Sequence, residues 1–310
     1  MKPATKVGLA FLGGFACARF LHRKAEVIKW SAGDSLDDLV SAHSENLRLH
    51  YSHYDEKFQR LRRSDPEAAA GEATLFSLLK TYFRASPEPA DEPGTGGVDF
   101  ICHRNGDEFV VEVTSLNPDT VHARSGISPT VDESSGGAFQ MVTTSLFNKA
   151  CGKADQLSGY SCARVLAITS THFASSFLLD TQGAEWLLTS EPRIQIPAGG
   201  PGRPVTMTTD LQNSIFFGPN AERHIVARRK SISAILLIGI FADQSNVVGI
   251  LHPEPAQPLN IGHFREVPFV RLSSWPIAGC VIKTEWVVDS PQAKTFWHSM
   301  VKGGWPGLSF

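Results

Sequence analysis

The stretch Gly96-Gly-Val-Asp-Phe-Ile-Cys-His-Arg-Asn-Gly-Asp-Glu-Phe-Val-Val-Glu-Val-Thr114 decides the fold of this chain. Within it, Asn105-Gly106 stands between two runs of β-branched and aromatic residues, Val98–His103 and Glu108–Leu116. An Asn-Gly pair in this setting is a strong short-range signal for a hairpin, because both residues tolerate the positive φ of a type I′ turn. The sequence therefore predicts two antiparallel strands joined by a two-residue turn.

The register of this hairpin brings two carboxylates together. With a two-residue turn, Asp99 falls directly opposite Glu112. Directly opposed side chains lie on one face of a sheet, with Cβ atoms ~4.5–5.5 Å apart. The other face is expected to be a continuous apolar surface made of Val98, Phe100, Cys102, Phe109, Val111 and Val113.

Like charges at opposed positions repel, so Asp99 and Glu112 need a compensating cation. A hard divalent ion such as Mg²⁺ suits oxygen ligands and would relieve the repulsion. The alternative is a solvated acidic pair on an exposed strand face, where water and salt screen the charges. Spacing alone leaves both interpretations open.

Helical and extended patterns surround the hairpin in an order typical of a mixed α/β fold. Apolar residues spaced by threes and fours predict helix over much of Ser35–Phe83, and Asp65-Pro66 is a typical helix start. The Pro- and Gly-rich segment Ser86–Gly97 is expected to be a loop. A polar loop, a helix and a strand are expected after the hairpin, over about 117–137, about 138–157 and Ala163–Thr169.

The C-terminal half adds a β-rich region. Residues 191–222 are rich in Pro and Gly and are expected to form a surface insertion. The preceding segment, Ala174–Leu188, fits a helix. A second hairpin and a last strand are predicted over Ser231–Phe241, Val247–Leu251 and Cys280–Val288.

Composition limits the classes of function. The 310 residues include 29 Lys and Arg against 31 Asp and Glu, a net charge of −2, so any polyanion site has to be local. Five widely spaced cysteines without a CxxC pair favour reduced thiols and a cytoplasmic protein. The sequence contains no GxSxG or HExxH motif, and its Gly-rich stretches lack the context of a phosphate loop.

The N-terminus carries the one apolar run that resembles a targeting segment. Lys2 and Lys6 precede the run Val7–Ala18, as in a weak signal sequence. The run is shorter than the ~20 residues that a bilayer requires, so no membrane partner is expected. A packed N-terminal segment is the alternative.

The hairpin resembles the PD-(D/E)xK nucleases, which have the restriction-endonuclease-like fold. Their motif is an Asp at the start of one strand and, about a hairpin later, Glu or Asp, one residue and Lys. Val98-Asp99 resembles the first element and Glu112-Val113-Thr114 the second. Val98 stands where Pro is usual and is not a ligand. Thr114 stands where Lys is usual, which removes the positive charge normally held beside the attacking water.

Two flanking segments extend the resemblance. Glu72 lies on the helix before the hairpin, where many members carry a Glu that helps to hold the metal. Downstream, Lys149, Lys153, Gln156 and Tyr160 resemble the Lys and Gln-x-x-x-Tyr helix of the recombination-exonuclease branch. Their offsets of four, three and four place them on one stripe of a helix. A solvated helix face is the alternative for both segments.

The resemblance implies a metal site and a reaction. One or two Mg²⁺ or Mn²⁺ ions would activate a water for attack on a phosphodiester. The implied metal ligands are Asp99, Glu112, the carbonyl of Val113, and Glu72.

The resemblance also implies roles around that site. Lys153 would supply the cation missing at position 114, and Gln156 would position it. The implied catalytic residues are Asp99, Glu112, Lys153, Glu72 and Gln156, and the implied substrate-binding residues are Thr114, Lys149 and Tyr160.

Three regions are expected: an N-terminal helical extension over 1–64, the nuclease core over 65–170, and a C-terminal α/β region over 171–310 that packs on the core or extends it. The expected function is metal-dependent hydrolysis of nucleic acid, DNA more than RNA, in prokaryotic defence or DNA processing, by a homodimer or with a partner defence protein. One alternative, which Thr114 favours, is an inactive domain that binds nucleic acid or protein. The other is an unrelated α/β protein with a purely structural hairpin.

Overall fold

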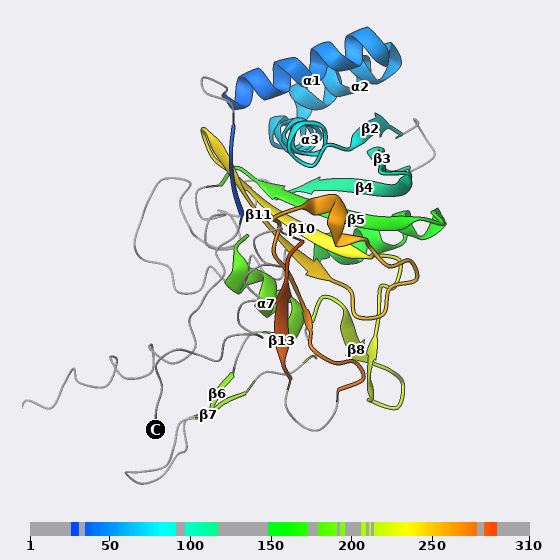
Figure 1. Ribbon diagram of the computed structural model, residues 1–310, viewed down its shortest axis with the longest axis vertical. Helices are drawn as coiled ribbons and strands as arrows, with labels where there is room; N and C mark the ends of the chain where they lie inside the picture. The colour runs from blue at the N-terminus through cyan, green and yellow to red at the C-terminus, as the bar shows by residue number, and fades with distance from the viewer. Residues whose placement is uncertain are drawn as a thin grey trace, which may run out of the picture.

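The computed structural model describes residues 26–30, 35–90, 97–116, 148–172, 179–190, 193–195, 206–208, 211, 214–277 and 282–289. Within these residues the chain has an α/β fold, in which helices flank a mixed sheet of nine strands (Figure 1). The strand order is β13-β12-β11-β10-β5-β4-β3-β2, and β1 pairs with β11 outside this path.

The strands of the large sheet are β1 (Glu26–Lys29), β2 (Ser86–Pro89), β3 (Phe100–Arg104), β4 (Asp107–Ser115), β5 (Ala163–Ser170), β10 (Ala234–Ile240), β11 (Gln244–Leu251), β12 (Phe269–Leu272) and β13 (Thr284–Val287). Two small antiparallel pairs are β6 (Arg193–Gln195) with β7 (Thr206–Thr208), and β8 (Phe217–Pro219) with β9 (Ile225–Ala227). The helices are α1 (Leu36–His50), α2 (Ser52–Ser64), α3 (Pro66–Ser77) and α7 (Thr181–Thr189), with a π-helical turn η1 (Leu78–Tyr82), 3₁₀ turns η2 (Gln156–Gly159) and η3 (Ile261–Phe264), and a helical segment over 148–154.

The predicted hairpin forms as expected. β3 and β4 pair antiparallel, with Arg104 opposite Asp107. Asn105 and Gly106 have φ values of 53° and 85°, as a type I′ turn requires. The predicted start of α3 is also confirmed, because the Asp65 side chain accepts a hydrogen bond from Ala68 N at 3.0 Å and Pro66 follows it.

The large sheet continues past the boundary expected at residue 170. β5 lies parallel to β4 on one side and parallel to β10 on the other. β10 and β11 form the second predicted hairpin, and β11 pairs with both β1 and β12. Strands from the C-terminal region therefore extend the sheet that contains the β3–β4 hairpin.

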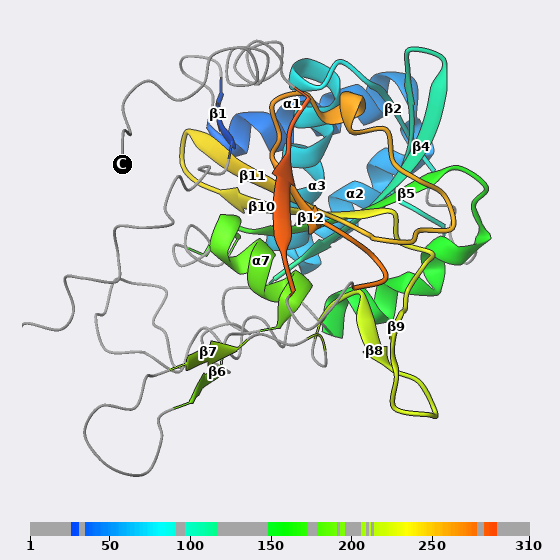
Figure 2. The same cartoon turned by 60° about the horizontal axis from the view of Figure 1, so that its bottom comes forward.

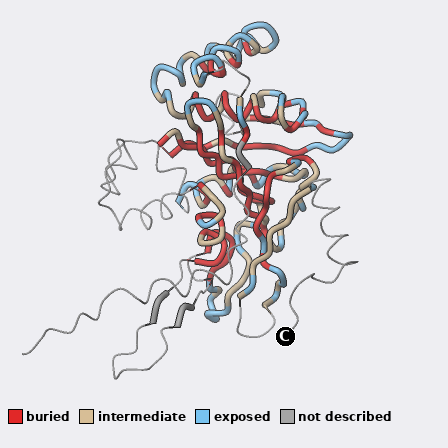
Figure 3. Tube along the Cα trace, turned by 60° about the vertical axis from the view of Figure 1, so that its left-hand side comes forward, coloured by how far each residue is buried: buried red, intermediate tan, exposed pale blue. Residues whose placement is uncertain are grey.

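Helices cover both faces of the sheet (Figures 1 and 2). On one face α3 and η1 pack on the strands, and their shared apolar cluster includes Phe76, Phe83, Phe100 and Phe109. On the other face, α7 and the 148–159 segment share a second cluster. The helices α1 and α2 lie over α3, away from the sheet, and Figure 3 shows that the buried residues concentrate in the strands and the helices next to them.

The pair α1 and α2 has a small core of its own. Apolar residues from both helices and from α3 form a third cluster, which contains Val40, Leu47, Phe58, Ala69, Ala70 and Ala73. Ser35 begins α1 with a capping box, in which its hydroxyl and the Asp38 carboxylate each bond the other residue's backbone N–H. This helical pair is held on α3 and carries several residues of the candidate site.

Some expectations were wrong or lie outside the described residues. Ser86–Gly97 was expected to be all loop, yet its first four residues form the edge strand β2, whose Pro residues are tolerated because an edge strand needs fewer backbone donors. The run Val7–Ala18 and the 117–147 segment lie outside the described residues. No helix among those that are described is long and apolar enough to cross a membrane.

Candidate active site

The β3–β4 ladder ends at Phe100, the residue directly after Asp99. In a regular ladder Val113 would exchange backbone hydrogen bonds with Val98. Instead Val113 N donates to Asp99 Oδ2 at 2.7 Å, and Val98 N donates to Tyr160 Oη at 3.1 Å. The Asp99 carboxylate therefore replaces the backbone of Val98 as the acceptor for the N–H of Val113. Val113 directly follows Glu112 on β4.

The ladder pairing stops one pair short of Asp99 and Glu112, which were predicted to stand directly opposite each other on one sheet face. Phe100 does lie opposite Val111, so the expected register holds up to the last pair of the strand. Asp99, however, precedes β3, and its carboxylate turns toward the backbone of β4. For the same reason Val98 leaves the apolar face predicted for it and is buried in the cluster on the other face.

Gln156 and Tyr160 hold the segment that carries Asp99. Gln156 Nε2 donates to the carbonyl of Gly97 at 2.5 Å, and Tyr160 Oη accepts the N–H of Val98. These bonds draw residues 97 and 98 out of the ladder, which explains where β3 begins. The structure thus gives Tyr160 a role in positioning the chain, where substrate contact had been predicted.

Glu112 and Lys153 form an ion pair across the sheet face. The Glu112 side chain is 3% exposed, whereas that of Lys153 is 30% exposed. Lys153 Nζ also donates to Gln156 Oε1 at 3.0 Å. The second carboxylate oxygen of Glu112, Oε2, is buried and accepts no hydrogen bond, so it is a buried acceptor without a partner.

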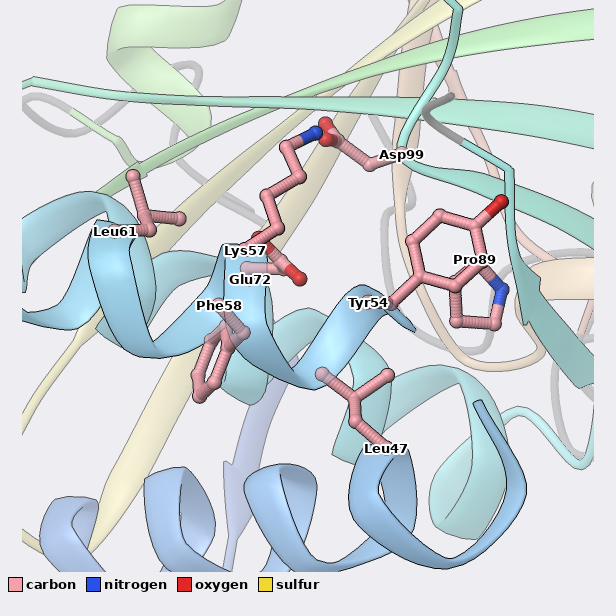
Figure 4. Close-up of a pocket in the computed structure, with 8 residues that line it drawn as sticks. All are labelled: Leu47, Tyr54, Lys57, Phe58, Leu61, Glu72, Pro89 and Asp99. Carbon is pink, nitrogen blue, oxygen red and sulfur yellow. The ribbon is translucent and has the colours of Figure 1, made fainter. Parts of the chain in front are cut away.

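Glu72 approaches the site from α3. Its carboxylate lies 3.2 Å from His43 Nε2, and His43 is buried against the rings of Phe58 and Phe76 at centroid distances of 4.7 and 4.5 Å. Glu72 and Asp99 line the same small cavity (Figure 4). The helix residue predicted from the sequence is therefore brought to the site, with a histidine that fixes its orientation.

The electrostatics of the acids follow from burial and mutual repulsion. Burial, with repulsion from Glu112 and then Glu72, raises the pKa of Asp99 well above its ordinary value, against the Val113 hydrogen bond and the charge of Lys153. Burial also raises the pKa of Glu112, although the hydrogen bond and the charge of Lys153, the backbone N–H of Asp99 and the charge of Lys57 act in the opposite direction. A nearby positive charge therefore stabilises the ionised form of both acids.

Lys57 on α2 is, like His43, a site residue that the sequence did not predict. It lines the same cavity as Glu72 and Asp99, and Figure 4 shows its ammonium group directed toward the Asp99 carboxylate. No spacing in the sequence relates Lys57 to the hairpin. The contact depends on how α2 packs on α3, which is a tertiary property.

Two of the residues predicted to bind substrate have no evident place in the cavity. Thr114 lies on β4 opposite Ile168 and is 7% exposed. Lys149 lies one turn before Lys153 in the 148–154 segment and is exposed. Neither side chain is among the residues that line the cavity between Asp99 and Glu72, and the same is true of Glu112, Lys153 and Gln156.

The donor set fits a hard cation on two carboxylates. Among the described residues, no group of three or more His, Cys, Asp or Glu side chains forms a metal site. Glu112 nonetheless presents a buried carboxylate oxygen without a hydrogen-bond donor, and the half-buried Asp99 adds a second carboxylate. The Val113 carbonyl points to the same edge of β4 as its N–H, toward Asp99. Oxygen ligands of this kind suit Mg²⁺ or Mn²⁺.

Comparisons of the chain with protein-family models, with curated proteins and with solved structures gave no match.

Proposed function

We propose that this chain is a metal-dependent nuclease that hydrolyses phosphodiester bonds of nucleic acid, with DNA favoured over RNA. The observation that carries the proposal is that the Asp99 carboxylate bonds Val113 N, the residue after Glu112, and lies close enough to Glu112 to be repelled by it, while Lys153 is bonded to Glu112. The helix with Glu72, the β3–β4 hairpin, the 148–159 segment and β5 also follow one another in the order that the family resemblance implies.

Asp99, Glu112 and the Val113 carbonyl would hold Mg²⁺ or Mn²⁺, with Glu72 across the cavity. The bound cation supplies positive charge at the scissile phosphate and lowers the pKa of a water molecule. Gln156 and Tyr160 keep Asp99 in place through the backbone of residues 97 and 98. In the hydrolysis a water oxygen bonds to phosphorus, the P–O ester bond breaks, and one proton passes to the leaving oxygen.

Local basic residues could contact the phosphate backbone of the nucleic acid although the net charge of the chain is −2. The C-terminal half of α2 exposes Arg60, Arg62 and Arg63 close to the end of the helix that bears Lys57. A few such contacts give weak binding that falls as salt rises. A second basic run, Arg228-Arg229-Lys230, is less available, because Lys230 pairs with Glu254 and Arg228 donates to the Pro219 carbonyl.

The test uses the full chain with Mn²⁺ or Mg²⁺ and linear, circular and single-stranded DNA and RNA. Asp99→Asn and Glu112→Gln keep the shape of each side chain and should each lower the cleavage rate at least ~100-fold, a loss of ~3 kcal/mol of transition-state stabilisation. Glu108→Gln is the matched control, since Glu108 lies on the same strand with a side chain 53% exposed. Cleavage that persists in both folded site variants would rule out this site.

A second candidate function is that of an interaction module without catalysis. The observation that favours it is Thr114, a buried residue where the motif has a Lys. Calorimetric titration with Mn²⁺ alone separates the two functions. The nuclease requires Mn²⁺ binding, which Asp99→Asn should weaken. An inactive module does not need Mn²⁺ at Asp99 and Glu112, so a folded chain that shows no Mn²⁺ binding would support the second candidate.

A further inference from the structure

The candidate site has a second lysine, and it comes from outside the segment that resembles a nuclease. Lys57 lies on α2, and its ammonium group is directed at Asp99 (Figure 4). Its charge also acts on Glu112, to which Lys153 is bonded. Two lysines from two separate elements thus flank the pair of carboxylates.

The two lysines differ in their surroundings. Lys153 donates to Glu112 and Gln156, so it helps to fix the position of the Glu112 carboxylate. Lys57 lines the small cavity of about 20 Å³ that Asp99 and Glu72 also line. A cavity of this size has room for about one water molecule. Lys57 is therefore the cation next to the space in which a reacting oxygen would sit.

The surroundings of Lys57 fix its direction. On α2, Tyr54, Phe58 and Leu61 are close to Lys57 in the helix and line the same cavity. Phe58 is fully buried in the third apolar cluster, which anchors α2 on α3. The packing of α2 on α3 therefore holds the side chain of Lys57 in the direction of the acids.

We propose that Lys57 is a second catalytic lysine of this site, supplied by the N-terminal helical pair, and that its ammonium adds to the charge of Lys153 the positive charge that Thr114 cannot provide. The inference rests on the proposed nuclease function. As the water oxygen bonds to phosphorus and the P–O ester bond breaks, negative charge grows on the phosphate oxygens. The Lys57 ammonium stabilises that charge, and the proton lost by the water ends on the leaving oxygen.

Three variants of the full chain test this role. Lys57→Met keeps the length of the side chain without its charge and should lower kcat ~100-fold or more, the cost of removing one such electrostatic donor, with a smaller change in KM. Lys57→Arg should recover part of the rate. Lys80→Met is the matched control, because Lys80 is an exposed lysine on the neighbouring turn η1 and lies over the Phe76 ring instead of the acids.

A second readout uses Mn²⁺ alone, without substrate. Calorimetry at pH 8 should show that Lys57→Met binds Mn²⁺ at least as tightly as the wild type, because a nearby positive charge no longer repels the ion. Loss of cleavage with retained Mn²⁺ binding supports the proposal. Loss of both would overturn it, since Lys57 would then be needed to form the cation site.

The remaining outcomes also decide the question. If wild type cleaves and Lys57→Met cleaves within threefold of it, the role of Lys57 falls and the nuclease function stands. If Lys57→Met cleaves faster and binds Mn²⁺ far more tightly, Lys57 blocks the cation site, and the proposal is overturned. If wild type does not cleave under any metal, the nuclease function itself fails and the role of Lys57 fails with it.

Discussion

Asp99 combines a structural and a chemical role in one side chain. It accepts the N–H of Val113, which would otherwise lack a partner at the edge of β4. The same residue is half-buried and close to two other acids, Glu112 and Glu72. A carboxylate that burial and like charges destabilise, yet the fold retains, is typical of a functional position.

A variant without the negative charge of Asp99 should therefore be more stable than the wild type. Because the pKa of Asp99 is raised in the folded state, stability falls as pH rises from about 4 through the raised pKa, where the carboxylate ionises. Asp99→Asn can still accept the Val113 bond and should raise Tm at pH 8 in a chelator. The increase should be roughly 2–4 °C for each kcal/mol of repulsion removed.

The pH dependence is the control for this prediction. Near pH 4 the gain from Asp99→Asn should vanish, because the wild-type carboxyl is then protonated. Glu108→Gln, an exposed change on the same hairpin, should leave Tm unchanged at both pH values. A lower Tm for Asp99→Asn at pH 8 would contradict the burial and repulsion described for this group.

At the scale of single residues, the sequence predicts the parts of the site that local geometry determines. Asn105-Gly106 sets the register, so the sequence alone relates Asp99 to Glu112. It does not reveal the bond of Tyr160 to Val98, because that bond depends on where a distant helix ends. Lys57 is further removed still, since nothing in its local sequence points to the hairpin.

At the scale of elements, Gly71 sets how closely α3 approaches the sheet. A methyl group on Gly71 would overlap the hydroxyl oxygens of Thr169 and Ser115, which bond each other at 2.7 Å across β5 and β4. Glycine in a helix usually costs stability relative to alanine. Here it allows the contact that brings the next residue, Glu72, to the cavity.

Replacing this glycine should separate the two elements. Gly71→Ala is expected to lower the free energy of unfolding by ~1–3 kcal/mol, the usual cost of overpacking. Urea denaturation measures the change. Gly152→Ala is the matched control: Gly152 lies in the 148–154 helical segment with open space around its Cβ position, so alanine there should stabilise by up to ~1 kcal/mol. Equal effects at the two positions would disprove the close approach.

Elements with strong local signals were predicted well. Turn chemistry predicted the β3–β4 hairpin, and the Asp65-Pro66 cap predicted the start of α3. The edge strand β2 was not predicted. Pro87 and Pro89 indicate a loop, because proline lacks the backbone N–H that a central strand needs for pairing on both sides. β1 and β12 were missed because each is only four residues long and takes its partner from far along the chain.

At the scale of the whole molecule, His252 links acid pH to global stability. Its Nε2 donates to the Arg228 carbonyl at 2.7 Å, its Nδ1 accepts from Glu254 N at 3.0 Å, and its ring packs on Phe216. Burial lowers the pKa of His252 to about 4. The neutral ring is thus a satisfied core residue.

This histidine should weaken the fold in mild acid. The unfolded chain takes up a proton near pH 6.5 whereas the folded chain does not until about pH 4, so stability is lost as pH falls between these values. Between pH 7 and pH 5 the loss should be ~2 kcal/mol in urea unfolding. His252→Gln should show a smaller loss. His224→Gln changes a side chain 75% exposed and should behave as the wild type.

The separate core of α1 and α2 has a consequence for how this site could change during evolution. The carboxylates belong to the large sheet, whereas Lys57 belongs to a helical pair that packs through its own cluster on α3. Substitutions in that pair can therefore alter the charge at the acids while the hairpin sequence stays constant. Chains with the same β3–β4 hairpin could differ in activity for reasons found on α2, well upstream, where a motif comparison would not look.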